Sequence, residues 1–446
     1  MAKLMRSVSG IRGIVGSSLS PQSLSAHVKA YLEVIKAKKI ILGRDSRPSG
    51  DAISNFVASL CQLSGVEVLD VGLATTPTVE VLVTHYQCDG GIIITASHNP
   101  IEWNALKFLD NKGLFLGPEV IQKLFDIADQ GVFTYPDFSQ IQKHIPLKNS
   151  DDIHIQNILN IPFLRLKKIQ NTKFKVAIDA VNGAGSFIVP KLLKNLGCEV
   201  VELHCTPNGL FPRGAEPTPE NLSELSKTVI ENNCAVGFAL DPDADRCALV
   251  DSKGMAIGEE YTLAIATEEV LSQKSGPICI NLSTSRMNED IAKKYKSSCS
   301  RAKVGEINVS LQMIQENCII GGEGNGGVIL PASHYGRDSL VAVALVLSWM
   351  AHHQAGIEHF VDTNPRYFMP KKKFELQNKT LEKILEDTQK EFKDWNMDSR
   401  DGLRFEKENS WIHVRASNTE PVIRVIAEAP SEIEAENLCQ RVEKLI

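Results

Sequence analysis

The stretch Cys61-Gln62-Leu63-Ser64-Gly65-Val66-Glu67-Val68-Leu69 passes through Gly65 into a strand-like run, and Thr76-Pro77 follows it. A second stretch, Lys194-Asn195-Leu196-Gly197-Cys198-Glu199-Val200-Val201, has the same arrangement and is followed by Thr206-Pro207. The two stretches lie about one domain length apart. A unit that recurs at this spacing predicts several similar α/β modules.

Strand-like runs alternate with helix-like runs over most of the chain. We expect strands, short and rich in Val and Ile, at residues 39–42, 66–71, 91–94, 174–178, 199–203, 235–240, 278–282 and 318–320. Helices are expected to open at Ser20-Pro21, Gly117-Pro118 and Thr218-Pro219, where proline takes the first helical position. The apolar run Leu340–Ala351 predicts a buried helix that starts near Asp338 or Ser339. Alternating strands and helices predict α/β layers with substantially parallel sheet.

The pattern changes towards the C-terminus. Linkers are expected near residues 140–172, 250–258 and 361–373, and Lys371-Lys372-Lys373 in the last of them is expected to be a solvated surface stretch. Beyond it we expect a helix over 376–395, strands over 411–414 and 422–427, and a closing helix over 432–446. We therefore predict an α/β protein of three similar α/β domains with mixed sheets, over 1–150, 151–252 and 253–365, and a smaller α+β domain over 366–446.

Composition bounds the class of protein. Of the 446 residues, 43% are hydrophobic and 23% charged, which is typical of a globular protein. The net charge of -6 argues against nucleic acid or an anionic membrane as a partner. Ten cysteines without a CxxC pair, together with an N-terminus unlike a signal peptide, predict reduced thiols and a cytoplasmic protein.

The first candidate site, which we call the serine loop, is Thr95-Ala96-Ser97-His98-Asn99-Pro100. It follows the expected strand 91–94, and open α/β sheets bind ligands at the carboxyl ends of their strands. Ser97 could act as a nucleophile or carry a phosphoryl group, and His98 could steady the loop or touch a phosphate. The alternative is an ordinary turn serine.

The second, the acidic loop, is Asp241-Pro242-Asp243-Ala244-Asp245-Arg246, directly after the expected strand 235–240. Three carboxylates in five residues repel one another unless a cation lies among them. Hard oxygen ligands on a short loop suit Mg²⁺. Arg246 adds a donor that can hold a phosphoryl oxygen. The segment is not an EF-hand, because Arg246 and Ser252 replace the required glycine and glutamate.

Two further loops offer groups for a polar substrate. In the glycine loop, residues 321–327, Glu323 and Asn325 are the side chains able to bind the vicinal hydroxyls of a sugar. The C-terminal loop, residues 415–421, offers an anion-binding set of an arginine, two hydroxyls and an amide from Arg415, Ser417, Asn418 and Thr419. Near the N-terminus, Arg12 lies between glycines and could face a phosphate, whereas Arg44 and Arg47 are expected to make structural ion pairs.

In this order, the four loops resemble the α-D-phosphohexomutase family over nearly the whole chain. The family's phosphoserine loop, T-A-S-H-N-P, matches residues 95–100 without change. Its metal loop, D-G-D-G-D-R, matches 241–246 with Pro242 and Ala244 in place of glycines. Its sugar loop, commonly G-E-x-S-G-H, has Asn325 and Gly327 here in place of serine and histidine. Its phosphate loop, R-x-S-G-T-E-P, matches 415–421 apart from Asn418.

The resemblance implies four domains around a central cleft, each donating one loop. Ser97 would carry a phosphoryl group and pass it to a hexose monophosphate, with hexose 1,6-bisphosphate as activator and intermediate. One Mg²⁺ per chain would be held by phosphorylated Ser97 and by Asp241, Asp243 and Asp245. Arg246, Arg12 and His98 would lie around the migrating group. Lys107 matches the family's lysine downstream of the serine loop and would act as general acid or base, with its pKa lowered by neighbouring cations.

The run Trp103-Asn104-Ala105-Leu106-Lys107, taken with the glycine loop, resembles the branch that converts glucosamine 6-phosphate to glucosamine 1-phosphate. A mutase for glucose or mannose phosphates is the alternative, because Glu306 and Gly327 stand where relatives often carry histidine. A metal-dependent sugar phosphatase and a non-catalytic sugar-phosphate binder also remain open. We expect a monomer or homodimer acting on a small sugar phosphate.

Overall fold

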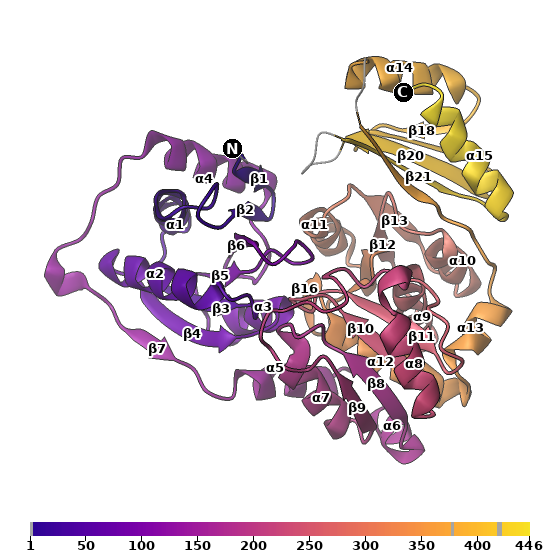
Figure 1. Ribbon diagram of the computed structural model, residues 1–446, viewed down its shortest axis with the longest axis horizontal. Helices are drawn as coiled ribbons and strands as arrows, with labels where there is room; N and C mark the ends of the chain where they lie inside the picture. Colours follow the sequence, from indigo (N-terminus) through magenta and orange to yellow (C-terminus); the bar gives the residue numbers. More distant parts are fainter. Residues whose placement is uncertain (1–2, 376–378, 417–421) are drawn as a thin grey trace.

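The first sheet is a mixed, seven-stranded sheet with the order β1-β2-β6-β5-β3-β4-β7. The computed structural model describes residues 3–375, 379–416 and 422–446 (Figure 1). The central pairs β3–β4 and β3–β5 are parallel, whereas β6 runs antiparallel to both β5 and β2. The strands are β1 (Met5–Ser7), β2 (Gly10–Ile14), β3 (Lys39–Arg44), β4 (Glu67–Leu73), β5 (Gly90–Ile94), β6 (Trp103–Leu109) and β7 (His144–Pro146), and the helices are α1 (Pro21–Ile35), α2 (Gly50–Leu63), α3 (Thr76–His85) and α4 (Pro118–Gln130).

Two smaller mixed sheets follow, with the orders β11-β10-β8-β9 and β13-β12-β14-β15-β16. The second sheet comprises β8 (Lys175–Asp179), β9 (Glu199–Leu203), β10 (Val236–Leu240) and β11 (Cys247–Asp251), with α5 (Ser150–Leu159), α6 (Leu166–Thr172), α7 (Gly185–Asn195) and α8 (Ser223–Glu231). The third comprises β12 (Ile278–Asn281), β13 (Cys299–Ala302), β14 (Ile320–Glu323), β15 (Gly327–Leu330) and β16 (His334–Arg337), with α9 (Glu260–Leu271), α10 (Met287–Lys294), α11 (Glu306–Glu316), α12 (Ser339–His353) and α13 (Ile357–Thr363).

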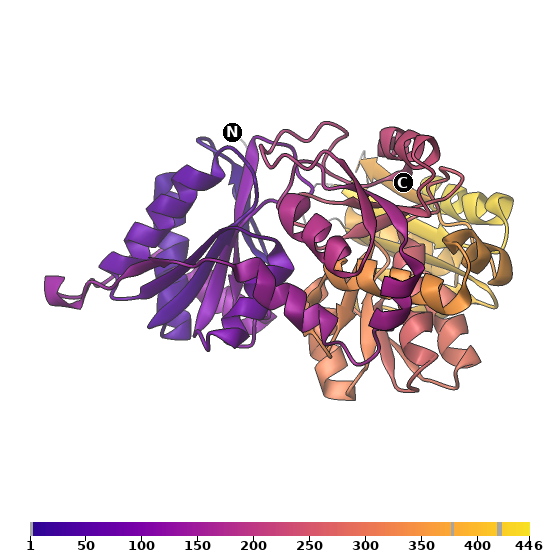
Figure 2. The ribbon, with the colours of Figure 1, turned by 90° about the horizontal axis from the view of Figure 1, so that it is seen from below.

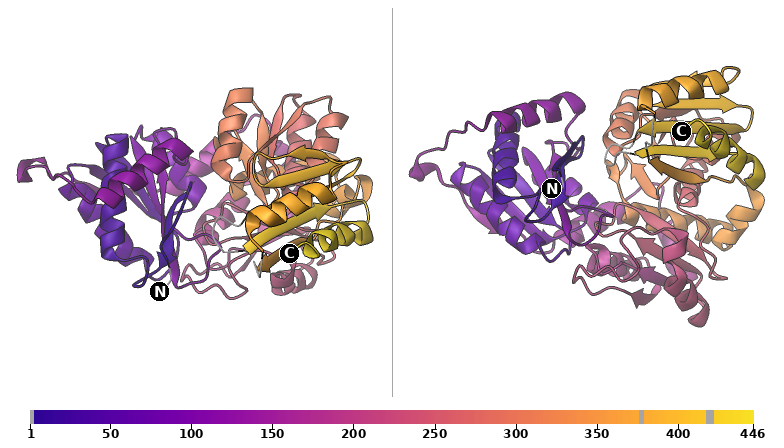
Figure 3. Two further views of the ribbon diagram at one scale, coloured as in Figure 1. Left: turned by 90° about the horizontal axis from the view of Figure 1, so that it is seen from above. Right: turned by 45° about the horizontal axis from the view of Figure 1, so that its top comes forward.

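The fourth sheet is antiparallel throughout, with the order β17-β21-β20-β19-β18. It comprises β17 (Lys371–Glu375), β18 (Asn396–Asp398), β19 (Leu403–Lys407), β20 (Ser410–Ala416) and β21 (Val422–Glu428), with α14 (Leu381–Glu391) and α15 (Glu432–Glu443). We call the four sheets with their helices the first to fourth domains. Figures 2 and 3 show the first domain at one end of the molecule and the fourth at the other. Three α/β domains and a smaller α+β domain confirm the predicted fold class.

The helix-to-strand repeat has a structural basis. Gly65 and Gly197 both have positive φ, +78° and +82°, a conformation that glycine adopts without strain. Each lies between a helix and the strand that follows it, α2 and β4 in the first domain and α7 and β9 in the second. β4 and β9 each add parallel to the preceding strand of their sheet. The sequence repeat therefore marks the same turn in two similar modules.

The second and third domains share one hydrophobic core, which α12 crosses. Residues 339–351 of this helix are buried, and Asp338 caps it by accepting a hydrogen bond from the Leu340 backbone N–H. Both the predicted burial and the predicted start of the helix are confirmed. Among the described residues, no single helix has the length and apolar composition needed to cross a membrane; α12 and α13 meet that requirement only as a pair bent by 75°.

A buried histidine cluster joins three domains. The Nε2 atoms of His154 on α5 and His334 on β16 both donate to Asp338 Oδ2, at 2.9 and 3.1 Å. Thr78 on α3 lies 3.0 Å from His154 Nδ1, and His334 Nδ1 lies 3.3 Å from Glu80 Oε2 on the same helix. Each ring nitrogen therefore has a polar partner, and the cluster serves as a link between domains.

Several local expectations are wrong. The linker expected at 140–172 contains α5 and α6, and Thr218-Pro219 opens only a 3₁₀ turn, with α8 beginning at Ser223. The helix expected over 376–395 is shorter, α14 at Leu381–Glu391, because Thr380 caps it by accepting from the Lys383 N–H; residues 376–378 lie outside the described part.

The lysine run is a strand and not part of a linker, although Lys371 and Lys373 are exposed, as predicted. Residues 371–375 form β17, which pairs with β21. Lys371 Nζ bonds to Glu259 at 2.7 Å and to Glu260 at 3.0 Å, both near the start of α9. Paired strand backbone and neutralising carboxylates are tertiary partners that the three lysines alone do not reveal.

Candidate active site

The serine loop is held in a strained conformation where β5 ends. Ser97 has φ +48°, unusual for a residue other than glycine, and its side chain is buried. Its backbone N–H donates to Thr95 Oγ1, which in turn donates to Asp45 Oδ2. Arg47 pairs with Asp45 and donates to the carbonyls of Ser97 and Asn99, each at 2.6 Å. Arg47 is thus a structural ion-pair residue, as predicted, and it fixes the serine loop.

The acidic loop lies directly against Ser97. All three of its aspartates are fully buried in the turn between β10 and β11. Ser97 Oγ donates to Asp241 Oδ2 at 2.9 Å, and Asp241 Oδ1 accepts from the backbone N–H groups of Asp245 and Arg246. The serine and the carboxylates that the sequence analysis singled out therefore form one cluster between the first and second domains.

Lys107 and Thr76, both from the first domain, hold Asp243. Its Oδ2 accepts from Lys107 Nζ at 2.7 Å and from Thr76 Oγ1 at 2.6 Å. Although burial opposes the shift, Lys107 and Thr76 lower the pKa of Asp243 well below its usual range. Burial also opposes the shift at Lys107, yet Asp243 and Asp245 raise the pKa of its ammonium group. The expectation of cationic neighbours that lower this pKa is therefore wrong.

The acidic loop fits a divalent cation. Carboxylate oxygens of Asp241, Asp243 and Asp245 lie within 4.8 Å of one another. The Oδ1 atoms of Asp243 and Asp245 are buried and have no hydrogen-bond partner among the described residues. Burial and the two neighbouring carboxylates raise the pKa of Asp241 well above its ordinary value. Converging, unpartnered hard oxygens are the donors that a metal such as Mg²⁺ prefers.

The other predicted charge-bearing residues surround this cluster. Arg12 Nη1 donates to Asn99 Oδ1 of the serine loop at 2.5 Å, and burial lowers its pKa to about 10. Arg246 Nη1 contacts Glu216 Oε1 at 3.1 Å. His98 Nδ1 lies 3.4 Å from the Ser97 oxygen. Burial, followed by the charges of Arg246 and Arg12, lowers the pKa of His98 well below its ordinary value, so its imidazole is neutral.

The glycine loop forms the turn between β14 and β15. Glu323 Oε1 accepts from Asn281 Nδ2 at 2.8 Å and from the Gly305 N–H at 2.9 Å. Its Oε2 accepts from Arg337 Nη1 at 2.9 Å. Asn325 Oδ1 accepts from the Gly327 N–H at 3.2 Å. Protein donors therefore hold both predicted sugar-binding side chains, which fixes their orientation.

Of the C-terminal loop, the structure describes only its first two residues. Arg415, near the end of β20, is buried, and it pairs in register with Arg424 on β21. Burial lowers the pKa of Arg415. Two arginines therefore lie next to each other on adjacent strands at the start of the C-terminal loop. The predicted site residues Ser417, Asn418 and Thr419 lie outside the described residues.

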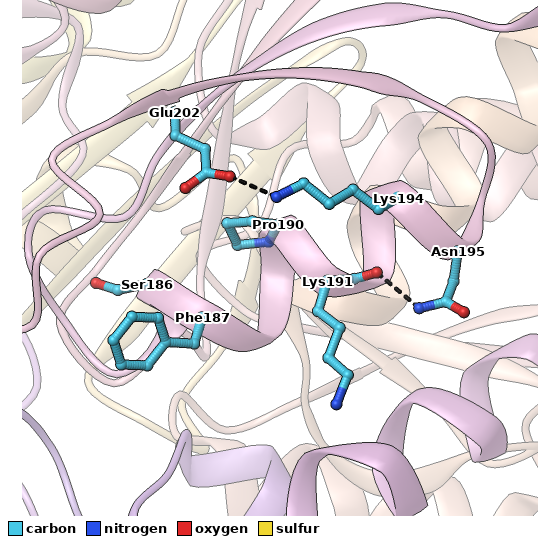
Figure 4. Close-up of a pocket in the computed structure, with 7 residues that line it drawn as sticks. All are labelled: Ser186, Phe187, Pro190, Lys191, Lys194, Asn195 and Glu202. Atoms are coloured by element: carbon cyan, nitrogen blue, oxygen red, sulfur yellow. Dashed lines mark hydrogen bonds and ion pairs between the residues drawn. The ribbon is translucent and has the colours of Figure 1, made fainter.

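A surface pocket on α7 lies apart from these residues (Figure 4). Its lining residues are Ser186, Phe187, Pro190, Lys191, Lys194, Asn195 and Glu202. Lys194 pairs with Glu202, and Lys191 pairs with Asp152. The pocket contains none of the predicted site residues, and its two cations are already paired with carboxylates.

Family models for phosphoglucomutase/phosphomannomutase match the chain in four consecutive parts. They are α/β/α domain I at residues 3–134, domain II at 152–254, domain III at 258–367 and the C-terminal domain at 372–445. The chain belongs to the phosphoglucomutase/phosphomannomutase family. Members of this phosphohexomutase family are isomerases that transfer a phosphoryl group, so the chain is an enzyme.

Similar proteins support this placement among the phosphohexomutases. A probable phosphoglucosamine mutase from Methanopyrus kandleri is 32% identical, over 96% of this chain and 95% of its own. A phosphoglucomutase/phosphomannomutase from Thermococcus kodakarensis is 33% identical, over 96% and 94%. The crystal structure of a phosphoglucomutase/phosphomannomutase family protein from Burkholderia thailandensis has the same fold, with a TM-score of 0.86, 24% identity and coverage of 98% and 95%.

Sequence analysis missed Arg337 and Thr76 in this phosphohexomutase site. Arg337 Nη2 donates to Asp245 Oδ2 at 2.6 Å, so this side chain touches the acidic loop as well as Glu323. Thr76 was noted only as part of a Thr-Pro repeat. The four loops contain more carboxylates than cations, and this excess could have indicated that an arginine from elsewhere in the chain was missing.

Proposed function

We propose that the enzyme is a phosphosugar mutase that interconverts hexose 6-phosphate and hexose 1-phosphate through a phosphoserine at Ser97. The observation that carries the proposal is the 2.9 Å hydrogen bond from Ser97 Oγ to Asp241. It places a nucleophilic oxygen at the edge of a buried carboxylate cluster that suits a divalent cation. Phosphoryl transfer is catalysed mainly by such positioning and by charge neutralisation.

In the forward half-reaction, the bond between phosphorus and Ser97 Oγ breaks and a bond to the free sugar hydroxyl forms. The proton of the sugar hydroxyl must end on Ser97 Oγ. Lys107, whose ammonium group lies 2.7 Å from Asp243, is the candidate to donate a proton first and to recover one from the sugar hydroxyl. The hexose 1,6-bisphosphate then reorients in the site, and its other phosphate is transferred back to Ser97. Arg12, Arg246 and His98 line the path of the migrating group.

Asp241, Asp243, Asp245 and the Ser97 phosphate would hold one Mg²⁺. When bound, the ion would neutralise charge on the transferring phosphoryl group. Glu323 and Asn325 would orient the sugar hydroxyls. Arg415, Ser417, Asn418 and Thr419 would bind the phosphate that is not reacting.

Glucosamine 6-phosphate is the substrate that we favour. The Methanopyrus kandleri relative is named a probable phosphoglucosamine mutase, whereas the Thermococcus kodakarensis relative is named for glucose and mannose phosphates. A panel of glucosamine, glucose and mannose 6-phosphates, each with a trace of the matching 1,6-bisphosphate, ranks these substrates by kcat/KM. A clear preference for glucose or mannose phosphate would overturn the glucosamine assignment and leave the mutase proposal intact.

Ser97→Ala tests the phosphoserine itself. We expect it to lower mutase turnover by roughly 1,000-fold or more, and to abolish labelling of the protein by radiolabelled hexose 1,6-bisphosphate. Ser186→Ala is the matched control, because Ser186 is equally buried but donates to a carbonyl within its own helix region. Steady release of inorganic phosphate without isomerisation would indicate the phosphatase. Binding without labelling of Ser97 would indicate the non-catalytic binder.

A further inference from the structure

One buried arginine holds three carboxylates that come from separate parts of the site. Arg337 ends β16, and only 8% of its surface is exposed. Its Nε donates to Glu306 at 3.0 Å, its Nη1 to Glu323 at 2.9 Å and its Nη2 to Asp245 at 2.6 Å. The Arg337 backbone N–H also donates to Glu306, at 3.1 Å. A planar guanidinium can make these three bonds at once, which a lysine ammonium on one flexible stem cannot reproduce.

Two departures from the family sequence pattern are explained by this arginine. A Cβ atom added at Gly327 would lie 2.3 Å from Arg337 Cδ and 2.9 Å from its Cγ. The arginine can therefore take this path only because position 327 has no side chain. Glu306, the other departure, supplies the carboxylate that Arg337 grips from two sides. Gly327 and Glu306 therefore both meet Arg337 directly.

The contact with Asp245 decides which of its oxygens remains available. Arg337 occupies Asp245 Oδ2, while Asp245 Oδ1 stays buried without a hydrogen-bond partner among the described residues, with Arg246 Nε 3.7 Å away. Asp243 is held in the same way, because Lys107 and Thr76 occupy its Oδ2 and leave its Oδ1 unpartnered. Cationic or hydroxyl donors thus engage one oxygen of each carboxylate and leave the other without a hydrogen bond. Outer groups of this kind fix the orientation of metal ligands.

We propose that Arg337 is a positioning residue that sets the Asp245 carboxylate for divalent-cation binding and couples it to Glu323 of the glycine loop. The inference rests on the proposed role of the acidic loop as the metal site. It assigns Arg337 an action through Asp245, without contact with the reacting atoms. It also implies that position 327 is a glycine because the Arg337 side chain needs the space, and not because the sugar does.

Arg337→Lys tests the proposal with the positive charge retained. We expect binding of Mn²⁺ alone, measured on the metal-free, unphosphorylated enzyme by calorimetry or electron paramagnetic resonance, to weaken by about 10- to 100-fold. Arg165→Lys is the matched control, since Arg165 pairs with the buried Glu269 away from the acidic loop, and we expect its Mn²⁺ affinity to equal that of the wild type. Affinity in Arg337→Lys that is unchanged or tighter would overturn the proposal, because a purely electrostatic arginine opposes cation binding.

Gly327→Ala gives a second route that does not depend on how well the lysine variant folds. In the wild-type background the added methyl group displaces Arg337, so Mn²⁺ affinity should fall as in Arg337→Lys. In an Arg337→Ala background the colliding Cγ and Cδ atoms are gone, so Gly327→Ala should change the affinity less than about twofold. Equal losses in both backgrounds would contradict the coupling.

These measurements separate this inference from the proposed function. Mn²⁺ binding needs neither Ser97 nor a sugar phosphate. Mutase activity that fails while Arg337→Lys still weakens Mn²⁺ binding would reject only the mutase. A wild-type enzyme with mutase activity and an unaltered Mn²⁺ affinity in Arg337→Lys would reject only the role of Arg337.

Discussion

The acidic loop after β10 and the end of β20 at Arg415 belong to the same candidate site, yet they are held in different ways. The acidic loop is bonded from both sides: Ser97, Thr76 and Lys107 reach it from the first domain, and Arg337 reaches it from the third. The fully buried aspartates thus have a fixed geometry before any substrate arrives.

The end of β20 is carried by the fourth domain, which rests on the third. Ser283 Oγ lies 2.8 Å from His413 Nδ1, the Arg286 N–H donates to Glu428, and Lys371 reaches Glu259 and Glu260. Figure 1 shows the fourth sheet beside the third domain, across from the first. From this difference we propose that the acidic loop, whose contacts are already formed, mainly sets kcat and that the fourth domain mainly contributes substrate affinity.

The largest effect on activity is expected from a substitution in the acidic loop. Asp243→Asn removes a proposed metal ligand and the partner of Lys107, so kcat should fall by at least about 100-fold, and Mn²⁺ binding should weaken strongly. Asp251→Asn is the control, because Asp251 is also buried in the second domain but caps a turn through Lys253 and Met255. Unchanged dependence of activity on the divalent cation in Asp243→Asn would contradict a metal site in the acidic loop.

The histidine cluster of His154, His334 and Asp338 should make the stability of the fold depend on pH. Although burial opposes the shift, Asp338 and Glu80 raise the pKa of His334 to about 10. Because an unfolded histidine titrates near 6.5, the protonated side chain stabilises the fold fully below about pH 6.5. That stabilisation is lost as the pH rises through about 10.

His334→Gln measures this contribution. The difference in unfolding free energy between wild type and variant, followed by thermal melts, should be widest at pH 6 and should close towards pH 10. His85→Gln, at an exposed position on α3, provides the control. A difference that stays constant from pH 6 to pH 10 would show that His334 holds no extra proton in the folded state.

The parts of this structure that could be predicted from sequence are those set by local patterns. Short Val- and Ile-rich runs located β3, β5 and β10, and the loops that follow β5 and β10 carry Ser97 and the aspartates. A strand buried on both faces needs an apolar run whatever its partner. Its carboxyl end is also where parallel sheets gather ligand-binding groups.

What the sequence did not predict depends on distant partners. β6 carries Lys107 between apolar residues, and β16 ends at Arg337; both strands run antiparallel to a neighbour. Their charges are buried only because Asp243 and Asp245 meet them from another domain. β17 was not predicted for the same reason. Its lysines form a strand because the strand pairs with β21 and because Glu259 and Glu260 neutralise Lys371.

A smaller effect is expected at the end of β20. Arg415→Gln removes the cation at the start of the C-terminal loop, so KM for the sugar phosphate should rise about tenfold. The change in kcat should be no more than about threefold, because the reacting groups lie elsewhere. Arg441→Gln, on the exposed face of α15, is the control. A loss of kcat with an unchanged KM would mean that Arg415 acts with the acidic loop on the chemical step. It would contradict the proposed separation of kcat and substrate affinity between the two regions.

The smallest effect is expected where the fourth domain meets the third. Lys371→Gln breaks the ion pairs with Glu259 and Glu260, which cross between the two domains. The Lys371 side chain is 38% exposed, so the cost to stability should stay below about 1 kcal/mol. Lys372→Gln is the matched control, since Lys372 pairs with Glu436 inside the fourth domain. Hydrogen exchange at the start of α9 should rise in Lys371→Gln only, with Mn²⁺ affinity unchanged in both variants. Loss of Mn²⁺ affinity in Lys371→Gln would mean that the fourth domain also shapes the acidic loop, and that the two regions are not independent.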